Sequence, residues 1–193
     1  MRSRILVEKK RTENTLNLNE QRLDNKDMAS LAQYEKLDGV VSLSLRNNQF
    51  DYHGIQDLAS SPYLKNLTSL NLMNNAVGDK GLLLLAESPN LSQLEYLNLE
   101  NAGITALGIL ALSQSPHLSR LKELNLSGND LRQKGLRILA ESGNCKNLVK
   151  LRISGVPVGD SGFLALVHSN ILSQLEELEA MGNTITRKSL DSM

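Results

Sequence analysis

Apolar and polar residues follow a repeating order along the chain. Six segments share one pattern: VVSLSLRNN, LTSLNLMNN, LEYLNLENA, LKELNLSGN, LVKLRISGV and LEELEAMGN. They begin at Val40, Leu67, Leu94, Leu121, Leu148 and Leu175, so each start lies 27 residues after the one before, and ENTLNLNEQ from Glu13 fits the same frame. The order predicts seven repeats over residues 13–193, the last one truncated, with no insertion between them.

Each repeat predicts one strand followed by one helix. Apolar and polar residues alternate over the first nine positions, as in a strand with one buried face. Apolar residues then stand three apart at positions 16 and 19, which is the spacing of one helix face. The predicted fold is α/β: a right-handed β/α solenoid with parallel strands on its concave face and helices on its convex face. Residues 1–12 do not match the frame and carry an excess of basic residues, which predicts an N-terminal basic segment or cap.

The boundaries of the helices can also be read from the repeat. Asp24, Asp51, Thr105 and Thr186 stand where a helix needs an N-cap. Glycines recur three residues later, at Gly54, Gly81, Gly108, Gly135 and Gly162. A helical glycine costs about 1 kcal/mol relative to alanine, so this row predicts close packing against the neighbouring repeat. Cys145 occupies a position that is leucine in other repeats, which predicts a buried, inert thiol.

The frame LxxLxLxxN, followed by a cap, a glycine and a helix, resembles the leucine-rich repeat. The 27-residue unit is similar to that of the ribonuclease-inhibitor-like subfamily, and the tract LAESPNLSQLEYLNLENAGITALG resembles its bacterial members. The resemblance implies a horseshoe that binds proteins and performs no chemistry itself. It also implies a structural ladder of asparagines that bond backbone groups between repeats, at Asn48, Asn75, Asn129 and Asn183. Gln21, Ala102 and Val156 interrupt that ladder.

Charge and cysteine content narrow the class of partner. The chain has 21 basic and 21 acidic residues, and this balance argues against binding to nucleic acid or to an anionic membrane surface. A single cysteine rules out an intrachain disulfide, and no apolar run is long enough for a signal peptide or a membrane span. We therefore expect a cytoplasmic protein. For a bacterial effector, which the resemblance allows, that compartment would be the host-cell cytoplasm.

The sequence contains no recognisable catalytic constellation. The histidines His53, His117 and His168 occupy different positions of the repeat and should not converge. The zinc-protease, paired-cysteine, Walker A and nucleophile-elbow motifs are all missing from the sequence. We therefore expect no catalytic, cofactor-binding or metal-binding residues, no cofactor, and no enzyme activity.

Outward-facing strand residues divide the concave face into two halves. In the C-terminal half, the frame places Lys150 between Glu123 and Glu177, and Arg152 beside Glu179, so these charges should compensate one another. The N-terminal half is neutral, and Tyr96 is the only aromatic residue that we expect on this face. Because Tyr, Arg and Met are enriched at the centres of interfaces, we predict a protein-binding site there, although Tyr96 could instead simply cover its neighbours. Its residues are Arg46, Asn71, Met73, Tyr96, Asn98 and Glu100.

These observations predict a module that binds a protein partner of unknown identity. One alternative is a regulator of a partner enzyme, either an inhibitor or a GTPase activator; an activator would use loop residues such as Arg22, Arg46 or Asn47. Another is a recognition domain cut from a larger protein. The last repeat stops in mid-helix, so a second copy could cover its exposed end and form a homodimer.

Overall fold

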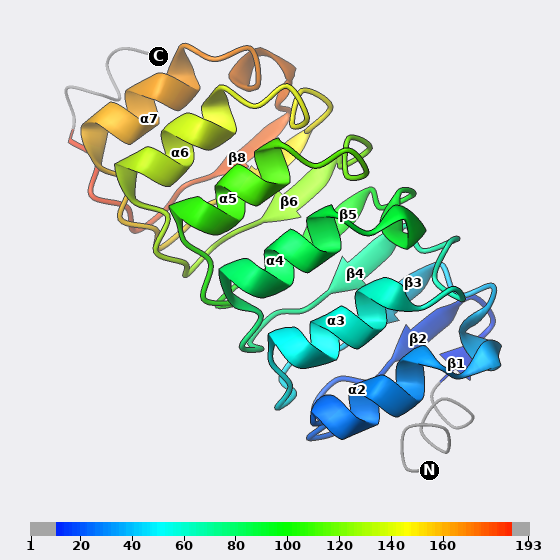
Figure 1. Cartoon of the computed structure of the whole chain (residues 1–193). Coiled ribbons are helices and arrows are strands. Elements are labelled where there is room, and N and C mark those ends of the chain that lie inside the picture. The colour runs from blue at the N-terminus through cyan, green and yellow to red at the C-terminus, as the bar shows by residue number, and fades with distance from the viewer. Residues whose placement is uncertain (1–10, 187–193) are drawn as a thin grey trace.

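A computed structural model describes residues 11–186 of the chain, and its secondary-structure elements follow one another as a solenoid (Figure 1). One sheet contains the strands in sequence order, from β1 to β8. The strands are β1 Arg11–Thr12, β2 Thr15–Asn17, β3 Ser42–Ser44, β4 Ser69–Asn71, β5 Tyr96–Asn98, β6 Glu123–Asn125, β7 Lys150–Arg152 and β8 Glu177–Glu179. Strands β2 to β8 are parallel, as predicted, whereas β1 pairs with β2 in the antiparallel sense.

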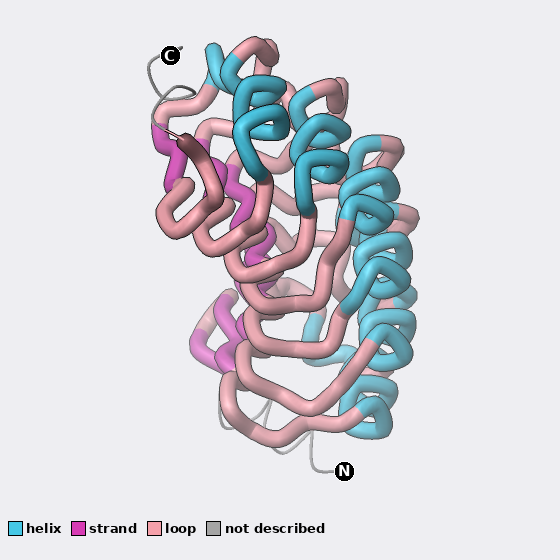
Figure 2. The backbone as a smooth tube through the Cα atoms, turned by 90° about the vertical axis from the view of Figure 1, so that its left-hand side faces the viewer, coloured by secondary structure: helices cyan, strands magenta, loops and turns pink. Residues whose placement is uncertain are grey.

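The helices lie on the other side of the molecule, opposite the strands (Figure 2). The α-helices are α2 Asn25–Ala32, α3 Tyr52–Ser60, α4 Gly78–Ala86, α5 Ala106–Ser113, α6 Arg132–Ala140 and α7 Gly159–Val167. Short 3₁₀ helices lead back to the sheet at η1 Glu35–Leu37, η2 Pro89–Leu91 and η3 Leu172–Gln174. Residues 1–10 and most of the predicted seventh helix, residues 187–193, lie outside the described part.

The register of the sheet places equivalent residues side by side. Leu43 lies opposite Leu70, which in turn lies opposite Leu97. The leucines at this fourth position are at most 1% exposed from Leu16 to Leu151, so they form one continuous core between strands and helices. In the last repeat Leu178 is only partly buried, and β8 is an edge strand among those of residues 11–186.

The asparagine ladder is confirmed. The side-chain Oδ1 of Asn48 accepts hydrogen bonds from the backbone N–H groups of Gln21 and Leu23, at 3.1 and 3.0 Å. Its Nδ2 donates to the carbonyls of Leu18 and Leu45. Asn75 and Asn129 make bonds of the same kind to the preceding repeat. In the last described repeat, Asn183 accepts a bond from the N–H of Val156, but its Nδ2 makes none.

Ala102 interrupts the ladder, but its backbone N–H is still bonded by the asparagine of the next repeat. The next repeat's Asn129 accepts hydrogen bonds from the N–H groups of Ala102 and Ile104. Because residue 102 is alanine, the preceding repeat receives no ladder asparagine from its neighbour. There the N–H of Val77 bonds instead to the carbonyl of Asn75, within the same turn. The helix that follows begins at Gly78 with φ of +62°, a conformation that suits glycine.

One inward position departs from the repeat frame. Leu172 was expected in the inward position that Cys145 occupies one repeat earlier, but it is half-buried, and the neighbouring Ile171 is the buried residue. The reason is a one-residue change in the 3₁₀ turn, since η3 begins at Leu172 whereas η2 ends at the equivalent Leu91. On the outer side of the helices, Leu83 of α4 and Leu110 of α5 are 42% and 39% exposed.

Candidate protein-binding face

The charged half of the concave face is cross-linked by ion pairs between neighbouring strands. Lys150 pairs with Glu177, and Lys122 lies 2.9 Å from Glu95. The guanidinium group of Arg152 is 2.7 Å from Glu179 and 3.8 Å from Glu177. The expected pairs Lys150–Glu177 and Arg152–Glu179 are therefore present, but Glu123 lies 4.0 Å from Arg152 and is not paired with Lys150, and Arg152 also bridges two carboxylates of β8.

These ion pairs shift the pKa values of their members. Burial opposes the positive charge of Arg152, but the hydrogen bond and charge of Glu179, together with the charge of Glu177, outweigh it and raise the pKa of Arg152. The hydrogen bond from Lys150 is the largest of the effects that lower the pKa of Glu177. Both groups are therefore charged at neutral pH, and their charges are paired within this half of the face.

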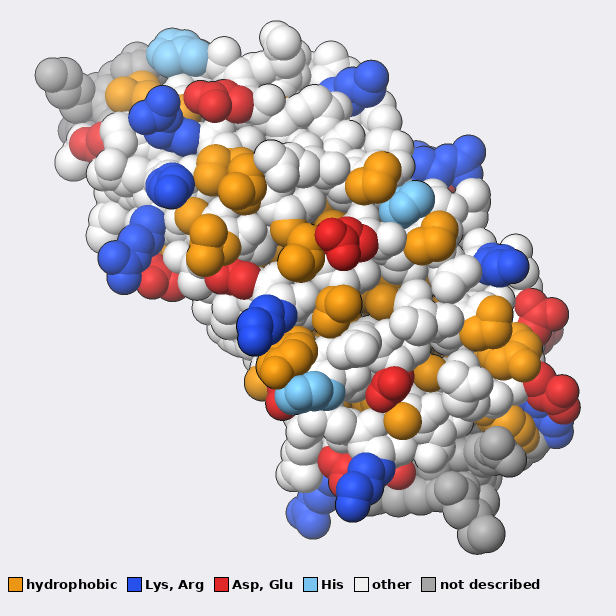
Figure 3. All heavy atoms as spheres, in the orientation of Figure 1, with side chains coloured by type: hydrophobic (Ala, Val, Ile, Leu, Met, Phe, Trp, Pro, Cys, Tyr) orange, Lys and Arg blue, Asp and Glu red, His pale blue; other side chains and the backbone are white. Residues whose placement is uncertain are grey.

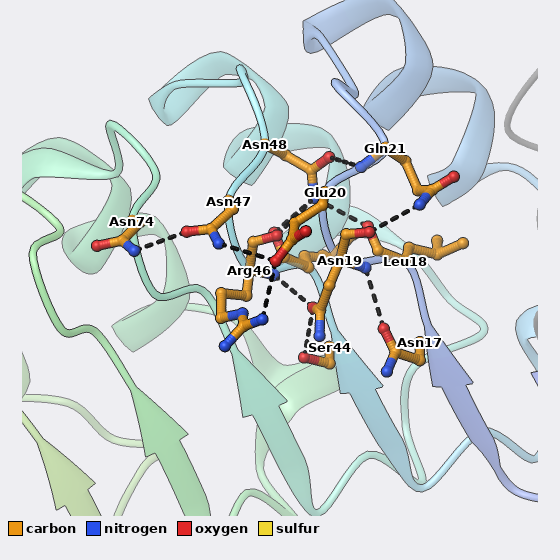
Figure 4. Close-up of polar contacts among 11 residues, drawn as sticks. Asn17, Leu18, Asn19, Glu20, Gln21, Ser44, Arg46, Asn47, Asn48 and Asn74 are labelled. Atoms are coloured by element: carbon orange, nitrogen blue, oxygen red, sulfur yellow. Dashed lines mark hydrogen bonds and ion pairs between the residues drawn. The ribbon is translucent and has the colours of Figure 1, made fainter.

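In the neutral half, Arg46 is held at the loop that follows β3. Its Nη2 lies 2.9 Å from the carboxylate of Glu20, which also accepts a hydrogen bond from Asn47 (Figure 4). The backbone N–H of Arg46 donates to the side chain of Asn19, which Ser44 also contacts at 2.7 Å. Arg46 is thus fixed by the preceding repeat while its side chain stays 40% exposed.

Asparagines at the ends of the strands bond the backbone of the loops that follow, a role that the repeat pattern did not predict. The Oδ1 atoms of Asn71 and Asn98 accept hydrogen bonds from the N–H groups two residues later, of Met73 and Glu100, at 3.0 and 2.9 Å. This local bond fixes the direction in which the chain leaves the strand. Asn98 is only 7% exposed, so it lies beneath the surface that its neighbours form.

The remaining amide groups orient the two side chains that stand out of the face. The Nδ2 of Asn98 donates to the hydroxyl oxygen of Tyr96 at 3.2 Å. The Nδ2 of Asn125, on the next strand, donates to the carboxylate of Glu100 at 3.0 Å. Tyr96 and Glu100 are both half-buried. The structure therefore brings Tyr96, Asn98 and Glu100 into one bonded group, with Asn71 and Met73 on the adjacent strand and loop.

A second row of asparagines runs along the loops that follow the strands. The amide of Asn101 donates to Asn74, and that of Asn74 donates to Asn47, at 3.0 and 2.6 Å. All three have positive φ, between 50° and 57°. Asparagine tolerates this conformation better than most residues, and glycine takes the place in the next repeat, where a Cβ on Gly128 would come within 1.9 Å of Asn101. The recurrence of Asn and Gly at the eighth position was the signal for this row.

A shallow hollow of about 560 Å³ lies beside this second row. Its lining includes Asn48, Phe50, Asn74, Ala76, Asn101 and Ala102, and every residue that lines it is uncharged. The hollow adjoins the ladder position at which alanine replaces asparagine. It extends the neutral half of the concave face onto the loops.

Within residues 11–186, no group of three or more His, Cys, Asp or Glu side chains is arranged to hold a metal ion. No helix in that same range is both long and apolar enough to cross a membrane.

Comparison with known proteins agrees with the geometry of the repeat. Two segments of the chain match the leucine-rich repeat. They cover residues 63–86 and 117–140, each spanning the end of one repeat and the start of the next. No curated protein matches the chain.

Two solved structures share the leucine-rich-repeat architecture. A chain in the crystal structure of the yeast Rad7–Elc1 complex is similar over 86% of this chain and 42% of its own length, with a TM-score of 0.64 and 19% identity. The internalin inlF of Listeria monocytogenes is similar over 86% and 47%, with a TM-score of 0.52 and 21% identity. The chain thus spans less than half the length of either neighbour, and identities this low establish the shared fold alone.

Proposed function

We propose that this chain is a non-enzymatic protein-interaction module whose partner binds the neutral half of the concave face. The proposed contact surface consists of Arg46, Asn71, Met73, Tyr96 and Glu100, with Asn98 beneath it. The observation that carries the proposal is the fixed, half-exposed ring of Tyr96. Its hydroxyl is bonded to Asn98, and its ring stands on a strand whose other outward neighbours are polar.

Binding at this site would cost little side-chain entropy, because the contact side chains of this chain are already ordered. Ordering a flexible side chain on binding costs about 0.5 to 1.5 kcal/mol. Tyr96, Glu100 and Arg46 are already held by Asn98, Asn125 and Glu20. A surface ordered before binding makes better use of each contact, and aromatic and arginine side chains contribute most to affinity.

The size of the face requires that the partner also touch the loops. Strands 4.8 Å apart give a concave face of about 500 Å², whereas a standard interface takes about 800 Å² from each partner. The uncharged hollow next to Asn74 and Asn101 is continuous with the face and supplies the additional surface. The yeast neighbour was crystallised in a complex between two proteins, which supports the use of this architecture for binding a protein.

The test is affinity capture followed by mass spectrometry, with wild type compared with Tyr96→Ala/Arg46→Ala. We expect the double variant to lose the partner that wild type retains. The matched control is Tyr52→Ala/Arg120→Ala, which removes the same two residue types from α3 and from the loop after α5, away from the face. Equal capture by wild type and the Tyr96/Arg46 variant would contradict the proposal.

Activation of a partner GTPase is the alternative function. It needs a side chain that can reach the nucleotide; Arg46 and Asn47 are both bonded to Glu20, whereas Arg22 is exposed on the loop after β2. A hydrolysis assay on any captured GTPase separates the two functions. Acceleration that is lost in Arg22→Ala would support the regulator, and an unchanged rate would leave binding as the function.

A further inference from the structure

The outer faces of α4, α5 and α6 carry a second surface, unrelated to the concave one. At the level of the helix midpoints are the apolar side chains of Leu83 and Leu110, which are 42% and 39% exposed, and Leu107, 65% exposed, lies beside them at the start of α5. Figure 3 shows hydrophobic side chains gathered over the middle helices of the convex side. Helix α5 contains no charged residue at all, which is unusual for a helix that faces solvent.

The apolar centre is flanked by charges of opposite sign at the two ends of the neighbouring helices. On α4, Lys80 stands near the start and Glu87 caps the end. On α6, Lys134 and Glu141 occupy the equivalent positions. All four are exposed. The members of each pair are seven residues apart, which is about two helical turns, so they share one face of their helix.

This pattern is complementary to itself. When two such faces meet with their helices antiparallel, the start of each helix lies over the end of the same helix in the other copy. Lys80 then faces Glu87 of the second copy, and Lys134 faces Glu141 of the second copy. The midpoints of both pairs fall at the level of Leu110 on α5. One two-fold axis therefore satisfies both pairs and brings the apolar centres together.

We propose that a second copy of this chain binds here, as a dimer related by a two-fold axis that crosses α4, α5 and α6. The surface is bounded along the solenoid: the equivalents of Leu83 and Leu84 on α3 are Gln56 and Asp57, so the apolar stripe ends there. On α6 the equivalent residue is Arg137, 3.9 Å from Glu141 of its own helix; the axis sets it beside Arg137 of the second copy, so the apolar contact is made by α4 and α5 and α6 contributes its end charges.

The dimer is weak. Three helices about 13 Å long and about 10 Å apart present roughly 400 Å², about half of what a standard interface takes from each partner. The expected dissociation constant is micromolar or higher, and the dimer forms only as the protein is concentrated.

Charge reversal tests the symmetry of the contact as well as its location. Lys80→Glu/Lys134→Glu makes the flanks wholly acidic, and Glu87→Lys/Glu141→Lys makes them wholly basic. We expect each variant alone to dimerise at least about tenfold more weakly than wild type, and an equimolar mixture of the two to recover a heterodimer. Neither change should harm the fold, because acidic residues suit a helix start and basic residues a helix end.

The measurement is sedimentation velocity of the full chain between about 5 and about 500 µM, a range that spans micromolar dissociation constants. Leu107→Glu should abolish the dimer, and Gln56→Glu on α3 is the control that should leave it unchanged. Wild type that remains monomeric throughout, or a mixture that does not recover association, overturns the proposal. Binding of wild type to phospholipid vesicles, lost in Leu107→Glu, without any dimer would assign the surface to a membrane instead.

Discussion

The carboxylate of Asp79 on α4 caps the start of α5 by accepting a hydrogen bond from the backbone N–H of Gly108, at 2.9 Å. The same carboxylate receives the N–H and the hydroxyl of Thr105, at 2.8 and 2.6 Å. Each helix start has orphan N–H groups, and here the preceding repeat satisfies some of them. A Cβ on Gly108 would lie 2.6 Å from this carboxylate, so only glycine leaves room for the Asp79 side chain at this position.

Gly108→Ala should therefore destabilise the protein, even though alanine is the better helix former. We expect a loss of about 1 to 3 kcal/mol of unfolding free energy, since the added methyl group displaces the Asp79 side chain. Urea denaturation gives the value. Gly143→Ala is the control: a Cβ there meets nothing within 4 Å, and the substitution should leave stability unchanged or raised. Equal effects at the two positions would show that Asp79 moves aside without cost.

Asn129→Ala should be more damaging than a substitution in the second row of asparagines. The buried side chain of Asn129 bonds the N–H groups of Ala102 and Ile104 and the carbonyls of Leu99 and Leu126. Leaving these groups unpaired should cost about 2 to 4 kcal/mol. Asn101→Ala, on the exposed row, should cost about 1 kcal/mol, because alanine tolerates its positive φ less well than asparagine and one exposed hydrogen bond is lost. The midpoints of urea unfolding compare the two directly, and a smaller loss for Asn129→Ala would contradict the assigned role.

The sequence predicted the solenoid and its core because the inward positions are set by short-range periodicity. Leu43, Leu70 and Leu97 occupy the same place in a 27-residue unit, so their common burial follows from the pattern alone. The cap from Asp79 to Gly108 was not predicted, because it joins residues 29 positions apart through a turn whose conformation depends on Gly78. The sequence does carry a sign of this cap. An Asn or Asp stands at the thirteenth position of a repeat, at Asn25, Asp79 and Asp160, wherever the next repeat has Asp or Thr at the expected N-cap position.

The concave site was predictable in its position and less so in its internal bonding. Alternation places Tyr96 and Asn98 on the outward face, but only the geometry shows that Asn98 is nearly buried and supports the Tyr96 hydroxyl. Side-chain bonds between neighbouring outward residues depend on rotamers, which the periodicity does not specify. The contact role of these residues remains a prediction.

Cys145 should be unreactive in the folded protein. Burial raises the pKa of its thiol to about 11. The reactive species is the thiolate, so at pH 8 a thiol reagent such as Ellman's should label the native chain at least about a hundredfold more slowly than the chain in denaturant. Fast labelling of the native protein, at a rate independent of stabilising conditions, would show that the repeat around Cys145 opens locally.

The paired charges of β7 and β8 predict how stability depends on pH. The pKa of Glu177 is lowered in the folded protein, chiefly by the hydrogen bond from Lys150. A carboxyl group with a depressed folded pKa contributes stability above its unfolded pKa, near 4.3, and loses that contribution as pH falls through the folded value. Unfolding midpoints measured at low ionic strength should therefore decline below about pH 4.5. The decline should be shallower in Glu177→Gln, and screening by about 1 M salt should reduce the difference because both groups are near the surface.

Glu35→Gln, at an exposed residue of η1, is the matched control and should leave the pH profile as in wild type. A Glu177→Gln profile that coincides with wild type would contradict the assignment of this ion pair as a stabilising contact of the last two strands.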